Sequence, residues 1–90
     1  MMEIVIDTYM HDENYYTLKV KGYNYYIHLG WVSQFVFNNS HEDYIKFLSK
    51  INHSSESRRY HDVLLFKTTE DAQNAIDILN SIMMLNALTQ

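Results

Sequence analysis

The chain has 90 residues, of which 47% are hydrophobic and 20% are charged, and it contains no cysteine and no proline. This length provides one modest core and this composition excludes a disordered tail, so we expect a single α+β domain over residues 1–90. The missing cysteines exclude disulfides and cysteine–zinc sites and favour a cytoplasmic location, while the net charge of −4 disfavours non-specific binding to DNA. The first residues lack a basic and apolar leader pattern, which predicts neither a signal peptide nor a membrane anchor.

The first predicted elements are strands. Residues 3–10 and 15–21 alternate apolar and polar side chains, which indicates two half-buried strands joined by a polar turn. Gly22 and the residues after it favour a tight hairpin that leads into a long third strand over residues 25–37. Gly30 would mark a bulge or bend in that strand.

The second half of the chain predicts two helices and one further strand. Ser40 and the apolar spacing after it indicate a helix over residues 41–52, followed by a polar loop up to His61. The short apolar run 63–66 predicts a buried strand. Thr68 or Thr69 then begins a last helix that extends toward Leu88.

These elements predict an α+β fold in the order β-β-β-α-β-α, with a four-stranded mixed sheet and two helices on one face. A right-handed crossover would make the fourth strand parallel to the third, either beside it or next to the first strand. We favour the spatial order 3-2-1-4.

Tyrosine is concentrated near the start of the chain, where six of the eight tyrosines fall within the first 26 residues. Tyrosine supplies rigid contact area with a polar tip, and it is common where proteins bind partners. We therefore predict a non-enzymatic protein-binding module that uses the open sheet face, the loop 53–61, or both. The predicted contact residues are Tyr15, Lys19, Lys21, Tyr26, His28, Arg58, Arg59 and Tyr60.

Two other functions remain open at this point. The open sheet face could bind nucleic acid or a nucleotide, with aromatic rings stacking on bases and Lys19 and Lys21 meeting phosphates. The apolar end of the last helix could instead form a homodimer through Met84 and Leu85, in a structural oligomer. No histidine pair has the spacing of a metal site and no nucleophile stands in a recognisable motif, so we expect no metal, no cofactor and no catalysis.

The composition as a whole also carries a resemblance. Abundant Asn, Ile, Tyr and Lys, together with the missing proline and cysteine, resembles the small early accessory proteins of AT-rich bacteriophages. Such proteins often bind and disable host or defence factors. The resemblance implies an inhibitor or modulator that acts in the host cytoplasm.

Overall fold

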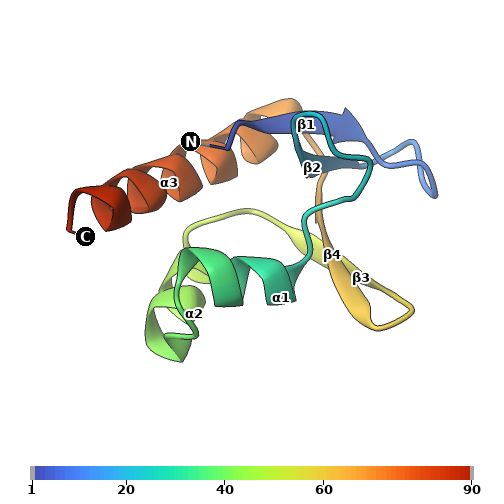
Figure 1. The fold of residues 1–90 in the computed structure, drawn as a ribbon. Helices are drawn as coiled ribbons and strands as arrows, with labels where there is room; N and C mark the ends of the chain where they lie inside the picture. Colours follow the sequence, from blue (N-terminus) through green and yellow to red (C-terminus); the bar gives the residue numbers. More distant parts are fainter. Residues whose placement is uncertain (1, 90) are drawn as a thin grey trace.

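A computed structural model describes residues 2–89 and shows an α+β fold of four strands and three helices (Figure 1). The first of the helices, α1, continues directly into the π-helical turn η1. In chain order the elements are β1 Ile4–Thr8, β2 Tyr16–Val20, α1 Leu29–Trp31, η1 Val32–Val36, α2 His41–Ser49, β3 Ser54–Arg58, β4 His61–Phe66 and α3 Thr69–Leu88.

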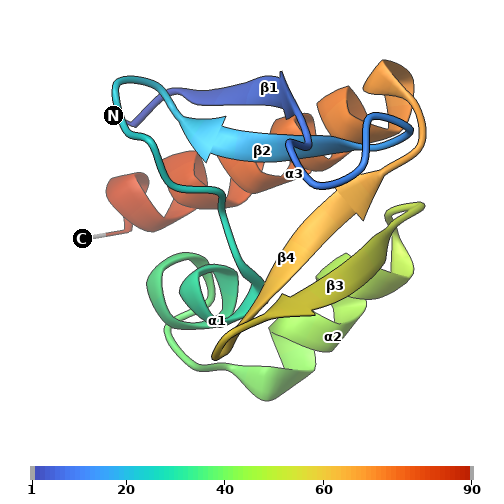
Figure 2. The same cartoon turned by 90° about the vertical axis from the view of Figure 1, so that its right-hand side faces the viewer.

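The sheet is antiparallel throughout and has the order β1-β2-β4-β3. The prediction of a mixed sheet in the order 3-2-1-4 is therefore wrong. β1 and β2 form one hairpin, β3 and β4 form another, and only two residue pairs, Tyr16 with Phe66 and Thr17 with Leu65, join them. Figure 2 shows β2 and β4 meeting at this junction and diverging from it at an angle.

Residues 25–37 do not form the predicted third strand. Only two isolated bridges, Lys19 to Tyr26 and His28 to Val63, connect this segment to the sheet, and helix begins at Leu29. The alternation that predicted a strand ends near Trp31, where apolar residues recur at helical spacing. His28 caps the new helix because its Nδ1 accepts a hydrogen bond from the backbone N–H of Trp31 at 3.1 Å. Gly30 consequently lies in a helix and marks no bulge.

The loop predicted up to His61 is also wrong in part, since Ser54–Arg58 forms strand β3. Its side chains are polar and mostly exposed, so no apolar alternation identifies it. β3 forms because it pairs in antiparallel fashion with all residues of β4 except the last. This hairpin replaces the predicted parallel crossover, because a two-residue connection permits only antiparallel neighbours.

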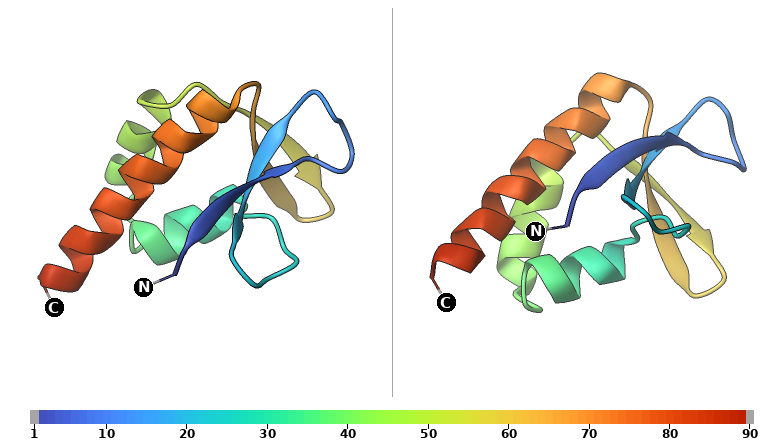
Figure 3. Two further views of the ribbon diagram at one scale, coloured as in Figure 1. Left: turned by 90° about the horizontal axis from the view of Figure 1, so that it is seen from above. Right: turned by 45° about the horizontal axis from the view of Figure 1, so that its top comes forward.

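The helices cover one face of the sheet, as predicted, although there are three of them and not two. Thr68 caps α3 by accepting from the backbone N–H of Asp71 at 3.0 Å. The main core lies between this sheet face and the helices, and it includes Ile4, Leu18, Val32, Val36, Phe47, Leu64, Phe66, Ala75, Ile76 and Leu79. Figure 3 shows α3 running along β1 on this side.

The other face of the sheet carries a second, smaller core. Tyr9 has no exposed surface and packs with Val63 and Leu65, and Tyr15 and Tyr26 cover this group from outside. The connection between β1 and β2, which carries Tyr9 and Tyr15, folds over the sheet (Figure 2), and Tyr26 comes from the segment after β2. Much of the face that the sequence presents as open is therefore buried under the chain itself.

Candidate partner-binding surface

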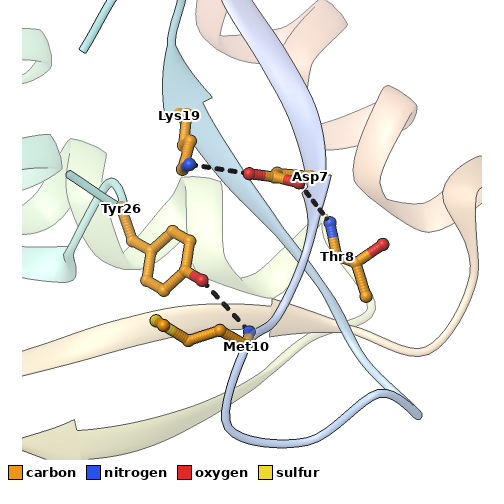
Figure 4. A network of polar contacts seen from close by, with 5 residues as sticks. All are labelled: Asp7, Thr8, Met10, Lys19 and Tyr26. Carbon is orange, nitrogen blue, oxygen red and sulfur yellow. Dashed lines mark hydrogen bonds and ion pairs between the residues drawn. The ribbon is translucent and has the colours of Figure 1, made fainter. Parts of the chain in front are cut away.

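Both lysines of the predicted sheet-face site are already paired with carboxylates. Lys19 Nζ lies 2.7 Å from Asp7 Oδ2, and Lys21 Nζ lies 3.4 Å from Glu3 Oε2. The hydrogen bond from Lys19 lowers the pKa of Asp7, and the same bond raises the pKa of Lys19. Lys19 also sits 5.3 Å from the centre of the Tyr26 ring (Figure 4). The positive charges of the two lysines are thus balanced by the carboxylates of Asp7 and Glu3.

Tyr15 and Tyr26 have structural contacts. Both rings pack against the second core, and the Tyr26 hydroxyl accepts a hydrogen bond from the backbone N–H of Met10 at 3.1 Å (Figure 4). This bond fixes the start of the connection between β1 and β2. Both side chains are partly buried, so only part of each is accessible to a partner.

Arg58 is also held by polar contacts within the protein. Its Nε donates to the Tyr9 hydroxyl at 3.1 Å, and its terminal nitrogen lies 2.7 Å from Glu56 Oε1. The hydrogen bond to Tyr9 raises the pKa of Arg58. Arg58 therefore connects the β3–β4 hairpin to the second core.

Arg59 and Tyr60 differ from the other predicted residues because they form the exposed tip of the β3–β4 hairpin. We call these two residues the hairpin tip. Arg58 pairs with His61, so the turn contains only two residues. Arg59 has φ of 57°, in the left-handed region where glycine is preferred at the first position of such turns. Tyr60 has 96% of its surface exposed.

An apolar hollow of about 340 Å³ lies beside the second core, and the sequence did not reveal it. Tyr25, 80% exposed, and the partly buried Trp31 stand in its wall. Both belong to the predicted third strand over residues 25–37, whereas in the structure Tyr25 precedes α1 and Trp31 lies within it. The helical spacing of Trp31 with Phe35 was the available signal. The full lining is Met2, Val20, Tyr23, Tyr25, Tyr26, Ile27, His28 and Trp31.

His28 connects this hollow to the hairpin tip. It lines the hollow, and its ring stacks on that of His61 with 4.2 Å between centroids and 25° between planes. His61 directly follows Tyr60 in the chain. We call these side chains together the aromatic surface, which consists of Tyr23, Tyr25, His28, Trp31, Tyr60 and His61.

The pKa of His28 is lowered, first by burial and second by the proximity of His61. Neutral His28 can accept the Trp31 hydrogen bond at Nδ1, whereas the protonated ring has no acceptor. The unfolded chain therefore takes up this proton first as the pH falls below about 6.5. The contribution of His28 to the free energy of unfolding is complete above that pH and is lost progressively below it.

We expect His28→Asn to reduce the loss of stability in acid. Asparagine keeps a side-chain acceptor for the helix start but does not titrate, so urea midpoints at about pH 7.5 and about pH 5.5 should differ less than in the natural protein. The variant retains the other four histidines, which serve as an internal control. An identical pH dependence in both proteins would exclude His28 as the titrating group.

The predicted dimer contacts lie at the far end of α3. Met84 and Leu85 are exposed on the last turns of this helix, which is anchored nearby by a 2.9 Å hydrogen bond from Asn86 Nδ2 to the Val36 carbonyl. They are accessible to a second copy, and the homodimer stays a prediction.

Residues 2–89 contain no group of three or more histidine, cysteine, aspartate or glutamate side chains placed to hold a metal ion. Within the same residues, no helix combines the length and the apolar character needed to cross a membrane. Comparison with protein-family models, with curated proteins and with solved structures returned no match to this chain.

Proposed function

We propose that this protein is a non-enzymatic protein-binding module that occupies the surface of a partner protein with its aromatic surface and hairpin tip. The observation that carries the proposal is the hairpin tip, where a non-glycine residue takes a left-handed conformation and presents an almost fully exposed tyrosine. Backbone conformations of this kind persist at functional sites although they lower stability.

The chemistry of the neighbouring surface fits a protein partner. Tyrosine and tryptophan side chains supply most of the binding energy in many protein interfaces, and they work best around a pocket that excludes water. Here Tyr25 and Trp31 line an apolar hollow, and Tyr60 is almost fully exposed at the hairpin tip. Arg59 has no carboxylate within 4 Å in residues 2–89, so its charge is available to a partner.

The resemblance in composition to bacteriophage accessory proteins gives this module a context. We propose that it inhibits or modulates a host or defence factor in the host cytoplasm by covering the partner's surface. Nucleic acid is a weaker candidate partner, because Lys19 and Lys21 are both paired with carboxylates. The phosphates of a nucleic acid would have to displace these carboxylates from the lysines.

The test uses tagged protein and a bacterial lysate divided into nuclease-treated and untreated halves. We expect one protein to be retained in both halves, and Tyr60→Ala to reduce its retention by at least about tenfold, as for a hot-spot tyrosine. Ile45→Ala, which removes an exposed apolar side chain on α2, should leave retention unchanged. Retention that disappears with nuclease, or that survives both Tyr60→Ala and Tyr25→Ala, would contradict the proposal.

Arg59→Gly separates binding from folding. Glycine adopts the left-handed conformation without the steric penalty, so we expect this variant to gain up to about 1 kcal/mol in stability, or about 4–8 °C in Tm. The same variant should retain less partner, because it lacks the exposed guanidinium. Thermal denaturation and retention from the lysate measure the two effects. A variant that is less stable and binds normally would show that Arg59 serves the fold.

A further inference from the structure

Strand β1 lies at the margin of the sheet and presents unpaired backbone groups there. Lys21 N–H donates to the Glu3 carbonyl at 2.8 Å, and Tyr9 N–H donates to the Tyr15 carbonyl at 3.0 Å. In an antiparallel pair these bonds alternate along the strand, so the N–H and C=O groups of Ile4 and Ile6 point away from β2. No other strand within residues 2–89 pairs with this edge.

The free edge ends at Thr8, whose N–H is occupied by Asp7 Oδ1 at 2.8 Å (Figure 4). Protein edges are commonly protected by lysine, proline or a bulge, because open edges pair with other chains. The stretch Ile4–Val5–Ile6 has neither lysine nor proline, and its pairing with β2 is in continuous register. It is therefore a template on which an extended segment can form a further strand.

A groove of about 530 Å³ runs between this edge and the first turns of α3, which lie beside β1 (Figure 3). Ile6 forms one wall, and Glu70 and Asp77 stand in the other. Neither of these carboxylates has a lysine or arginine nitrogen within 4 Å in the described part of the chain. The remaining lining residues, Thr69, Gln73 and Asn74, are neutral, so the groove has a net negative charge.

We propose that the β1 edge binds an extended basic peptide segment of a partner protein, which adds to the sheet as a fifth strand. Its backbone would exchange hydrogen bonds with Ile4 and Ile6. Alternate side chains of a strand face the same side, so lysine or arginine at every second position would reach Glu70 and Asp77. Pairing of two β1 edges is disfavoured, because it would bring two acidic grooves together. The site does not depend on the aromatic surface.

The probe is a peptide of about seven residues that alternates lysine and threonine, titrated while backbone amide signals are observed by NMR. We expect shifts at Ile4 and Ile6, and slower hydrogen exchange of their amides. Binding should be at least about tenfold weaker for a peptide of alternating glutamate and threonine. The lysine peptide methylated on the backbone nitrogens that face β1 should also bind at least about tenfold more weakly, because it keeps the charge but loses the donors.

Two variants of the protein give the matching changes. The double variant Glu70→Lys with Asp77→Lys alters only exposed side chains and should weaken binding of the lysine peptide by at least about tenfold. Ile6→Pro removes an outward N–H without breaking a bond to β2, and should have a similar effect. Tyr60→Ala should bind the peptide normally, which distinguishes this site from the aromatic surface. The proposal would be overturned if the methylated peptide bound as tightly as the lysine peptide, or if the NMR shifts occurred outside β1. It would also be overturned if self-association of the protein already protected the amides of the β1 edge from hydrogen exchange.

Discussion

Tyr9→Ala is expected to lower the free energy of unfolding by about 3–5 kcal/mol, as large aromatic truncations in cores do. Tyr9 has no exposed surface, and its ring centroid lies 5.5 Å from that of Tyr26. Its hydroxyl also accepts the hydrogen bond from Arg58 Nε. The substitution would remove the centre of the second core and the contact that ties the β3–β4 hairpin to it. Urea denaturation followed by circular dichroism measures the loss.

Tyr9→Phe provides the matched control. It keeps the ring and removes only the hydroxyl, so we expect a loss of about 1 kcal/mol, because water can replace the oxygen at the half-exposed Arg58. A loss below about 1 kcal/mol for Tyr9→Ala would mean that the second core contributes little. In that case the sheet face would be an accessible surface, as the sequence alone predicts.

The sequence predicted the regular elements best where one periodicity extends over a whole element. β1, β2 and α3 each follow a single pattern of apolar spacing, and a short apolar run marked β4. The segment 25–37 contains two patterns in succession, alternation first and helical spacing second. The predicted strand follows the first pattern and wrongly includes the residues of the second. The error changed the topology, because without a third strand β4 pairs with β2 and with the unpredicted β3.

The candidate site was predictable in residue type but not in accessibility. Arg59 and Tyr60 follow from an exposed turn between polar residues, and they are at the surface. Lys19 and Arg58 depend on partners from other parts of the chain, namely Asp7 and Tyr9, and only the register of the strands brings these together. A loop that folds over a sheet leaves no local pattern in the sequence. The alternation of a strand is therefore the same whether the second face of the sheet is covered by a loop or exposed to solvent.

Phe66→Ala is the second substitution with a large expected effect, also about 3–5 kcal/mol. Phe66 is 1% exposed, belongs to the main core and pairs with Tyr16 at the junction of the two hairpins. A chain of this size has a total stability of roughly 5–14 kcal/mol, so this loss is a large share of it. Phe35→Ala, the same change at a side chain that is 60% exposed, should lose less than about 1 kcal/mol.

The way in which Phe66→Ala unfolds is as informative as the size of the loss. The two hairpins share only two residue pairs, so the main core and α3 must supply most of the coupling between them. Trp31 is the single tryptophan and reports on the region of α1, while far-UV circular dichroism reports on all elements. Coincident transitions would show that the core still unites both hairpins. Separate transitions would show that the junction at Phe66 makes the fold one cooperative unit, and that the aromatic surface can loosen while α3 and β1 remain folded.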